Sequence, residues 1–432
     1  MYDVAVIGGG FAGVTAAREA ALRGRSVVLV EARDRLGGRT WSSDWGPAHP
    51  SRIEYGGAWV HWHQPHTWSE LSRAGLAVTL GDDAQAAGWY VGGLRREGTI
   101  PERDAIAQRG WDAFVDGVQT ALPMPHDPLF ALEQLGRFDR LTISERLDQL
   151  ALSQEEREVL VAELESLAHA PLDDAGAVSV LRWHALSGYS LALTQFTGGR
   201  VTIARGTGAL LASIADQAPF ERRLGAESVA VTQRNGRVEI ETADGGGCAA
   251  RAVVVAVPVN ALGAIQFTPP LSEPKQAAIA LGQASRGIKI FIHAAGEPVW
   301  QNSIRPGHPF GYLDTEAIFA DGTQLLIGFG VDASLCDAGD LPAVQRQLDE
   351  ILPGYSVLAA TAHDWLADRF SGGTWAIHRP GWYEHHHAPM QRAERRVVLA
   401  GSDIANGWAG FIDGAIESGL RAGKVAARLS AA

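Results

Sequence analysis

The chain has 432 residues, 46% of them hydrophobic and 20% charged, so it can bury one large core or two smaller ones and is not intrinsically disordered. Its 49 acidic and 37 basic residues give a net charge of −12, which disfavours duplex nucleic acid and anionic membranes as partners. Two cysteines, Cys248 and Cys336, are too few for a disulfide framework or a zinc site and suit a reducing compartment. No stretch reaches the roughly 18 apolar residues of a membrane span, and a strand-like run begins at residue 2, so we expect no signal peptide and a cytoplasmic location.

The first forty residues carry a nucleotide-binding pattern. A β-branched run at residues 2–7 precedes a turn with Gly8, Gly10 and Gly13, then an Ala-rich helix-like stretch, then an apolar run that ends at Glu31. Glycines let the backbone approach a pyrophosphate, a helix N-terminus attracts anions, and an acid about 20 residues further on accepts ribose hydroxyls. A lone glycine motif is most simply a tight turn, but this order of elements predicts dinucleotide binding. The acid at position 31 disfavours the 2′-phosphate of NADP.

Two further glycine segments follow that a plain NAD domain does not need. The first, RLGGR, contains Arg35, Gly37, Gly38 and Arg39, and the second is the YGGAW stretch around residues 55–59. Taken alone, the second arginine of RLGGR would be a solvated surface residue.

The middle of the chain changes character twice. Residues 80–195 are rich in helix formers, with capping boxes that begin at Thr142 and Ser153, and predict a helical insertion. From residue 201 the strand and helix pattern returns, with a hairpin signal at Asn235-Gly236. Further along, the chain predicts strands of a second sheet at 287–293 and 325–331, a covering helix at 342–352, and a closing strand, glycine loop and helix over 395–429.

These segments together resemble the flavin monoamine oxidase superfamily over essentially the whole chain. Within it the chain is most similar to bacterial 6-hydroxynicotine oxidases. That similarity is carried by MYDVAVIGGGFAG, the His-rich stretch after YGGAW, GIKIFIH, HDWLADRF and GSDIANGWAGFIDGA. The resemblance implies an α/β fold of two domains: a Rossmann-like FAD-binding domain, and a substrate domain with a mixed sheet flanked by helices. We assign residues 1–79, 196–281 and 390–432 to the discontinuous FAD-binding domain, and 80–195 and 282–389 to the substrate-binding domain.

The resemblance also implies the residues that contact FAD. RLGGR would lie along the pyrophosphate, the YGGA turn beside the isoalloxazine, Asp403 at the linker of FAD, and the helix N-terminus at residues 410–412 against the flavin pyrimidine. The expected cofactor residues are Gly8, Gly10, Phe11, Ala12, Gly13, Glu31, Ala32, Arg33, Gly38, Arg39, Gly56, Gly57, Ala58, Trp59, Val229, Trp365, Gly401, Asp403, Gly410, Phe411, Ile412 and Ala415.

Amine oxidation needs a neutral amine whose Cα hydrogen is held over flavin N5 in a dry aromatic slot. The resemblance gives Trp375 and Phe411 as the two aromatic walls of this cage, and Lys289 as a lysine that bridges through water to N5. Without the resemblance, Trp375 and Phe411 would be interpreted as core aromatics, and Lys289 as a half-exposed lysine on a strand. Many relatives carry two tyrosines in the cage, so the loss of both hydroxyls favours bulky hydrophobic amines. Thr374 stands where some relatives have the cysteine that bonds the flavin, so we expect non-covalent FAD.

The substrate cavity is expected to be lined by Trp59, His61, Ser166 and Tyr312. Ser166 replaces an amide residue expected there in nicotine-type enzymes. The remaining histidines, at 63, 66 and 385–387, are interpreted as exposed loop residues and not as a metal site, because flavin chemistry needs no metal.

We therefore expect an FAD-dependent amine oxidase that converts an amine to an imine and reduces O2 to H2O2. Its partners would be a small-molecule amine and O2, and a homodimer is left open. One alternative is an L-amino-acid oxidase, although relatives of that kind often carry a carboxylate-binding arginine just after the YGGA turn, where this chain has Trp59 and Val60. Another is a flavin-binding protein without turnover.

Overall fold

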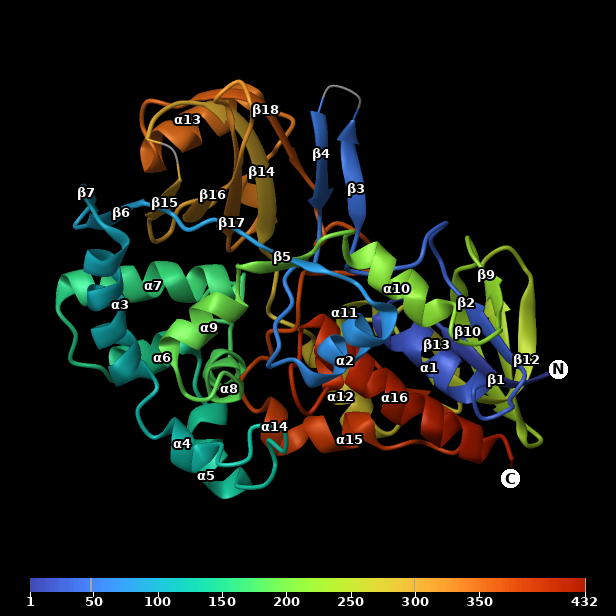
Figure 1. Ribbon diagram of the computed structural model, residues 1–432. Coiled ribbons are helices and arrows are strands. Elements are labelled where there is room, and N and C mark those ends of the chain that lie inside the picture. The colour runs from blue at the N-terminus through green and yellow to red at the C-terminus, as the bar shows by residue number, and fades with distance from the viewer. Residues whose placement is uncertain (47–48, 299, 432) are drawn as a thin grey trace.

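Two sheets of different construction organise the chain, with a helical region beside them (Figure 1). The computed structural model describes residues 1–46, 49–298 and 300–431. The first sheet lies near both termini, at the right of the view. Its strands are β1 (Tyr2–Ile7), β2 (Val27–Val30), β9 (Glu221–Arg223), β10 (Ser228–Arg234), β11 (Arg237–Thr242), β12 (Gly247–Val255), β13 (Gln266–Thr268) and β19 (Val397–Leu399).

The first sheet has a parallel centre. β19, β12, β1, β2 and β9 run in the same direction in that order, and β10 and β11 add an antiparallel meander to β12. The central strands are continuous apolar runs, buried on both faces, as is typical of parallel strands covered by helices. Because parallel strands end at one edge, the loops after β1, β2, β12 and β19 meet there.

Helices cover this sheet, and two of them, α1 (Phe11–Ala21) and α16 (Ile412–Leu429), lie side by side (Figure 1). The other helices and short turns near this sheet are α2 (Pro65–Ala74), α10 (Thr207–Ala215), α11 (Val259–Leu262), α12 (Glu273–Leu281), α15 (His387–Gln391) and η2 (Ser402–Ile404). The short helix α14 (Trp382–His385) precedes α15 and contacts the helical region. None of the described helices is both long and apolar enough to cross a membrane.

The second sheet is mixed, as expected. Its strands, in spatial order, are β18 (Ser356–Ala362), β14 (Ile288–Ala295), β17 (Gln324–Gly330), β16 (Tyr312–Ile318), β15 (Gln301–Ile304), β6 (Ala86–Val91) and β7 (Leu94–Gly98). Within this second sheet, β15–β6 is the only parallel pair of described strands, and the other pairs are antiparallel. The predicted strands at 287–293 and 325–331 and the covering helix at 342–352 are confirmed as β14, β17 and α13 (Leu341–Ile351), each within about two residues.

Alternation along β14 and β17 decides which side chains face the site. Ile288, Ile290 and Ile292 belong to the core under α13, whereas Phe291 and Phe329 belong to a cluster on the opposite face. Successive side chains of a strand point to opposite faces. Lys289 therefore points away from α13, toward the face that bears the two phenylalanines.

The insertion at 80–195 is not helical throughout, which corrects the sequence expectation. Residues 86–98 form the β6–β7 hairpin, which extends the second sheet, because Trp89 and Tyr90 are buried in it and Gly92 and Gly93 both have positive φ in the turn. Before it, β5 (Val78–Leu80) pairs with β8 (Val201–Ile203). The helices that follow are α3 (Ile100–Phe114), α4 (Val118–Ala121), α5 (Leu132–Asp139), α6 (Ile143–Asp148), α7 (Gln154–Ala168), α8 (Ala177–Leu186) and α9 (Leu191–Thr197).

Local predictions in this part of the chain are confirmed. Thr142 and Ser153 each form the reciprocal capping box with a glutamate three residues later, at the starts of α6 and α7. The Asn235-Gly236 turn joins β10 to β11 with both residues at positive φ, as a two-residue hairpin of that sequence requires. Two remaining short elements are the β3 (Ser42–Gly46) and β4 (His49–Glu54) hairpin and the turn η1 (Ala333–Leu335).

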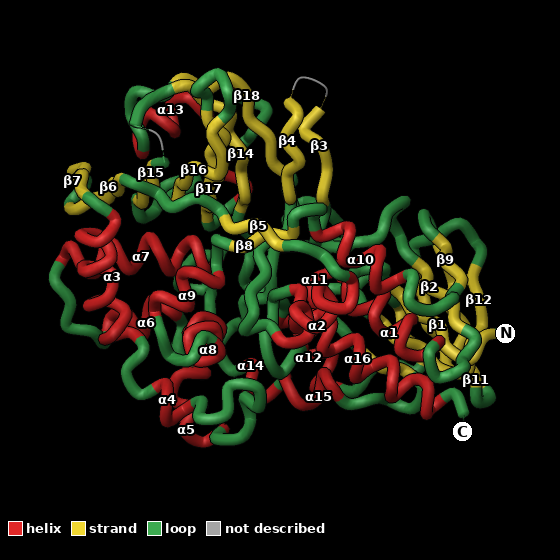
Figure 2. Tube along the Cα trace, in the orientation of Figure 1, coloured by secondary structure: helices red, strands yellow, loops and turns green. Residues whose placement is uncertain are grey.

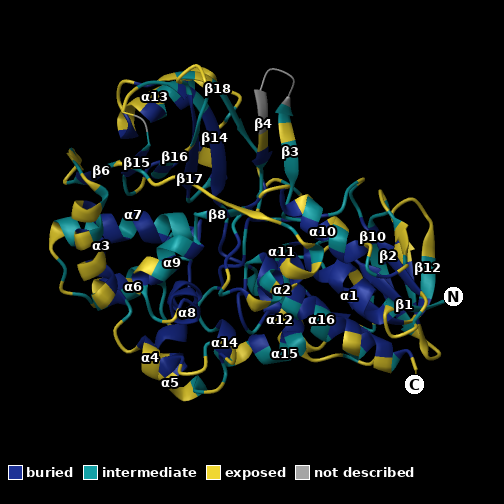
Figure 3. Ribbon diagram, viewed as in Figure 1, coloured by how far each residue is buried: buried dark blue, intermediate teal, exposed yellow. Residues whose placement is uncertain are grey.

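The α/β class is confirmed. Figures 2 and 3 show how helices and strands are segregated, and that the buried segments gather where these layers face one another. The first sheet draws its strands from 1–79, 196–281 and 390–432, and the second from 80–195 and 282–389. This membership supports the domain division given above, which we propose as the domain boundaries.

Candidate functional site

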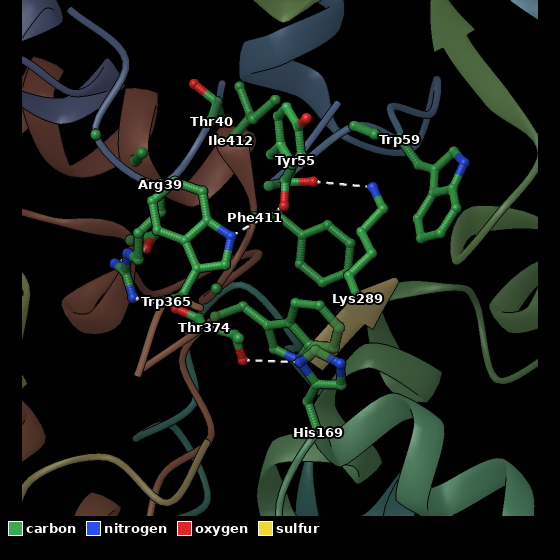
Figure 4. Close-up of a pocket in the computed structure, with 18 of the residues that line it drawn as sticks. Arg39, Thr40, Tyr55, Trp59, His169, Lys289, Trp365, Thr374, Phe411 and Ile412 are labelled. Atoms are coloured by element: carbon green, nitrogen blue, oxygen red, sulfur yellow. Dashed lines mark hydrogen bonds between the residues drawn. The ribbon is translucent and has the colours of Figure 1, made fainter. Parts of the chain in front are cut away.

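A cavity of about 880 Å³ reaches from the glycine loop after β1 to the second sheet. Its walls come from segments far apart in sequence, including the loops after β1, β2, β12 and β19, the end of α7, and strands β14, β16 and β17. Figure 4 shows a close-up of these side chains. One continuous space therefore joins a nucleotide-type loop to an aromatic pocket.

The nucleotide end is built by the β1–α1 turn. Helix α1 starts after Gly10, which has no side chain to cap the first turn, so its amide groups are available to a phosphate. Gly13 does not line the cavity. A β-carbon there would lie 1.8 Å from the Gly8 carbonyl oxygen, so this glycine allows the loop to close on the helix.

Glu31 stands at the end of β2, on the cavity wall, and is 4% exposed. One carboxylate oxygen accepts the Gly9 amide at 2.5 Å and the other accepts the Arg33 amide at 2.8 Å. The acid therefore ties the end of β2 to the glycine loop, at the position where ribose hydroxyls are expected. Arg33 is held in turn by Asp368, with both carboxylate oxygens at 2.8 Å.

Arg39, in RLGGR, and Asp403, in the loop after β19, form a partly buried ion pair. Arg39 lines the cavity and also donates to the Thr374 carbonyl at 2.8 Å, so it is not a solvated surface residue. Asp403, which was expected at the linker of the cofactor, does not line the cavity, and its second oxygen accepts the Val259 amide at 2.9 Å. Although burial raises the pKa of Asp403, the Arg39 charge and these hydrogen bonds bring it below its ordinary value. Asp403 thus positions Arg39.

The second helix N-terminus, at α16, meets the same cavity. Gly410, Phe411, Ile412 and Ala415 line it, and the first turn of α16 has no side-chain cap at Phe411. Its amides and partial positive charge therefore face the cavity. Val229 is the other expected cofactor residue outside the lining, which instead includes its neighbour Ser228.

The YGGA turn is fastened by side chains from other elements (Figure 4). Lys289 Nζ donates to the Glu54 carbonyl at 2.7 Å and the Gly56 carbonyl at 3.1 Å, and Trp365 Nε1 donates to the Tyr55 carbonyl at 2.9 Å. Three consecutive carbonyls therefore accept hydrogen bonds from two residues predicted to lie by the flavin. A β-carbon at Gly56 would lie 1.9 Å from the Arg39 carbonyl oxygen, so the turn also packs directly on RLGGR.

Lys289 lies beside aromatic rings as well as carbonyls. Its Nζ is 5.0 Å from the centre of the Trp59 ring and 5.2 Å from that of Phe291. Burial lowers the pKa of Lys289 from 10.5 to about 8. The side chain is 5% exposed and lines the cavity, so a half-exposed strand lysine is excluded.

The two expected cage aromatics both line the cavity. Phe411 contacts Trp183 edge-on, with ring centres 5.2 Å apart. Trp375 stacks on His169 at 4.2 Å and 8°, and its Nε1 donates to the Leu167 carbonyl at 3.0 Å. Each ring is therefore held in one orientation by its neighbours.

The far end of the cavity is acidic. Burial, followed by the charge of Glu316, raises the pKa of Asp314 to about 7, and burial also raises the pKa of Glu316. Both side chains line the cavity, as does Glu163, which accepts from Trp111 Nε1 at 2.5 Å. The arginines at this end are already paired, Arg103 with Asp104 at 2.8 Å and Arg200 with Asp83 at 2.6 Å.

Three of the four expected substrate residues, Trp59, Ser166 and Tyr312, line the cavity. His61 does not, because its ring is fully buried between its neighbours, stacked 4.8 Å from His63 and edge-on to Phe196. Burial lowers the pKa of His61 to about 4.

The other histidines were expected in exposed loops, which is wrong for most of them. Among them, only His385 is exposed, and the three in helices are His66 in α2, His385 in α14 and His387 in α15. His387 departs furthest from the expectation. It is fully buried in α15 and hydrogen-bonds the Asn406 amide oxygen at 2.9 Å. Within the described residues no group of three or more His, Cys, Asp or Glu side chains is arranged to hold a metal ion.

Sequence reasoning missed His169, Phe329 and the acids of β16. Phe329 could have been predicted from the strand pattern. It is paired with Lys289 across β14 and β17, and it lies on the same face of β17 as Ile327, which also lines the cavity. His169 has no local signal, since its contacts come from residues more than a hundred positions away.

Comparisons with known proteins agree with this geometry. A profile of the family described as flavin containing amine oxidoreductase matches residues 11–426. The chain is 36% identical to pseudooxynicotine dehydrogenase of a Pseudomonas species, over 98% of this chain and 85% of that protein. It is 29% identical to (S)-6-hydroxynicotine oxidase of Paenarthrobacter nicotinovorans, over 97% of each. The solved structure of cyclohexylamine oxidase from Brevibacterium oxydans IH-35A has a TM-score of 0.78 at 20% identity, covering 99% of both chains, and shares the fold.

The residues of the cavity fit FAD. The uncapped N-termini of α1 and α16, the glycine loop and Arg39 suit the diphosphate, and Glu31 suits a ribose. The aromatic end beyond them leaves room for a flavin ring and a small substrate in one cavity.

Proposed function

The chain belongs to the family of flavin-containing amine oxidoreductases, with FAD as its cofactor, and we propose that it oxidises a bulky or cyclic amine without a carboxylate to an imine and passes the electrons to O2, forming H2O2. The observation that carries the proposal is that two aromatic side chains, Trp375 and Phe411, line the same cavity as the nucleotide loops. Their surroundings fix both rings.

Bound FAD supplies the acceptor for a hydride from the carbon next to the amine nitrogen. The chain need only hold the amine neutral and aligned. Trp375 and Phe411 supply apolar walls that disfavour an ammonium, and flat faces that orient the C–H bond. Neither ring carries a hydroxyl, so the slot suits a hydrophobic substrate.

The charges beyond the cage support the absence of a carboxylate. Asp314, Glu316 and Glu163 line the cavity there, and burial raises the pKa of each, so this end of the cavity already disfavours negative charge and a substrate carboxylate would add more of it. The nearby arginines are engaged by Asp104 and Asp83, and the residue after the YGGA turn is Trp59. These features disfavour the L-amino-acid oxidase alternative.

The oxidant that takes electrons from the reduced flavin needs its own argument, because the relative that is 36% identical is named a dehydrogenase. We propose O2 for this chain because Lys289 places a positive charge beside the YGGA turn, where it would stabilise negative charge that develops during reduction of oxygen. A chain whose reduced form reacts with a quinone or dye at least a hundredfold faster than with air-saturated buffer would instead be a dehydrogenase.

The test is anaerobic mixing of the purified holoprotein with amines, amino acids and nicotine derivatives, followed by admission of O2. We expect bleaching of the flavin absorbance by a bulky amine, H2O2 after oxygen is admitted, and a kcat/KM for the amine at least tenfold above that of the matching amino acid. A preference for the amino acid would establish the alternative oxidase. No bleaching by any of these compounds would favour a flavin-binding protein without turnover.

A further inference from the structure

His169 occupies an unusual position at the end of α7. It follows Ala168 as the C-terminal cap, with φ 52° and ψ 34°, in the left-handed region that glycine or asparagine usually occupies. It is also fully buried. A ring in so restrictive a backbone position points to a role for the side chain itself.

Both ring nitrogens of His169 have partners. Nε2 lies 2.7 Å from the Ile288 carbonyl oxygen, which can only accept, so Nε2 carries the hydrogen. Nδ1 then accepts from the Thr374 hydroxyl at 3.0 Å. Burial lowers the pKa of His169 to about 3, and the nearby charge of Lys289 adds to the effect. The ring is therefore neutral, and its tautomer is set by these two bonds.

The face of the same ring supports the cage. It lies 4.2 Å from the Trp375 ring and nearly parallel to it, at 8°. The indole N–H of Trp375 donates to the Leu167 carbonyl, two residues before His169. The end of α7 thus holds Trp375 by one hydrogen bond and one stacked ring, and it holds Thr374 by another hydrogen bond.

The backbone of His169 is tied to the start of β14. Its carbonyl accepts the amides of Arg286 and Gly287, both at 2.9 Å. A β-carbon at Gly287 would lie 2.6 Å from the His169 ring, so the ring fills the space that this glycine leaves. Two positions after Gly287, the same segment presents Lys289.

We propose that His169 is a positioning residue that sets the plane of Trp375 and joins this wall of the cage to the segment that carries Lys289. The proposal rests on the proposed function, in which Trp375 contacts the substrate. Because the ring stays neutral, it supplies a flat second layer behind the indole without placing a cation against the amine site.

Two substitutions separate the contributions of the ring and of the fold. Asparagine tolerates the left-handed backbone but has no ring to stack, so His169→Asn should lower the limiting rate of anaerobic flavin reduction at least tenfold while changing the amine Kd less than threefold. Phenylalanine keeps the stacked ring and loses both hydrogen bonds, so His169→Phe should recover at least a third of the wild-type rate. The visible circular dichroism of bound FAD should change in His169→Asn and stay close to wild type in His169→Phe.

His308→Phe is the matched control. His308 is also a buried histidine with both nitrogens engaged, to the Gln347 carbonyl at 2.9 Å and the Phe310 amide at 3.2 Å, but it does not line the cavity. Its substitution should lower thermal stability and leave the dichroism and the reduction rate unchanged. Should His169→Asn fail to fold, His169→Gly also accepts the left-handed backbone and lacks the ring, and it should slow reduction at least tenfold.

A wild-type rate and wild-type dichroism in His169→Asn, or in His169→Gly where that variant is used, would overturn the proposal. Equal losses in His169→Asn and His169→Phe would overturn it too, because the stacked layer would then not be what positions Trp375. The dichroism is recorded without substrate. If no amine reduces the wild-type protein, the proposed function fails while the dichroism still tests His169.

Discussion

Replacing Lys289 by methionine removes a buried positive charge and keeps the length and apolar contacts of the side chain. Burial lowers the pKa of Lys289 from 10.5 to about 8, so keeping it charged costs the folded chain about 3 kcal/mol at neutral pH. The ammonium also donates to the carbonyls of Glu54 and Gly56, and each such bond contributes about 1–2 kcal/mol. These effects oppose each other, so the free energy of unfolding should change by less than about 2 kcal/mol, and FAD content should be unchanged.

The reaction with oxygen should respond much more strongly. Losing one preorganised electrostatic contact of about 1.4–2.7 kcal/mol corresponds to a ten- to a hundredfold lower rate constant, which we expect for reoxidation of Lys289→Met by O2. Stopped-flow mixing of the reduced protein with oxygenated buffer measures this rate. A wild-type rate in the variant would mean that Lys289 serves only to fasten the YGGA turn.

The lowered pKa of Lys289 also predicts how the reoxidation rate and the stability change with pH. The folded pKa of about 8 lies below the ordinary 10.5, so the charge is lost as the pH rises through 8. Between pH 7 and pH 9 the charged fraction falls about tenfold, and reoxidation of the wild type should fall with it while the variant stays flat. Over pH 8 to 10.5 the wild type should gain stability relative to Lys289→Met, because the folded chain no longer carries the buried charge. Matching pH profiles for the two proteins would refute the reasoning.

Two further predictions concern the cofactor and the cage. Since Thr374 offers no thiol and its hydroxyl bonds His169, acid precipitation should leave the yellow colour in the supernatant, and colour retained in the pellet would show a covalent link. Trp375→Ala should slow anaerobic flavin reduction by amine at least tenfold with FAD content unchanged, because it opens the slot without touching the glycine loop. An unchanged rate would mean that Trp375 has only a packing role.

Local patterns in the sequence were enough for the nucleotide end of the site. The glycine loop, Glu31 and the final helix each follow from a short run of residues whose geometry is set by neighbours in the chain. The same holds for the capping boxes of α6 and α7 and for the Asn235-Gly236 turn. The β6–β7 hairpin carried a comparable signal in Gly92-Gly93 and in the strand-forming Trp89, Tyr90 and Val91 before it, which the prediction of a wholly helical insertion overlooked.

The substrate end depends on contacts between distant segments, so sequence periodicity could not place it. Lys289 was expected near the flavin, but only the structure brings its ammonium to the carbonyls of residues 54 and 56. His61 comes three residues after the YGGA turn but is fully buried, with its ring against those of His63 and Phe196. His169 acquires its role from Thr374, Trp375 and Ile288, none of which is near it in sequence.

The Arg39–Asp403 pair offers a test of whether RLGGR and the loop after β19 depend on each other in binding the cofactor. Asp403→Asn keeps the shape of the side chain and removes its charge, which leaves Arg39 unpaired with only 19% of its side chain exposed. Removing one partner of a buried pair costs about 3–5 kcal/mol, and the partial exposure of Arg39 places the expected loss near the lower end, about 3 kcal/mol. Because Arg39 lines the cavity and also bonds the Thr374 carbonyl, the Kd for FAD should rise at least tenfold.

Urea unfolding of the apoprotein and fluorescence titration with FAD measure these two effects. Glu384→Gln is the control, since its pair with Arg140 leaves the arginine side chain 71% exposed, where solvent screens the attraction. The pKa of Asp403 is held below its ordinary value, so the stabilisation is fully present above about pH 4 and is lost as the pH falls through the folded pKa. The difference between wild type and Asp403→Asn should therefore be constant from pH 7 to 5 and shrink in stronger acid. A loss no larger than that of Glu384→Gln would mean that Asp403 does not hold Arg39 in place, and that RLGGR and the loop after β19 meet the cofactor independently.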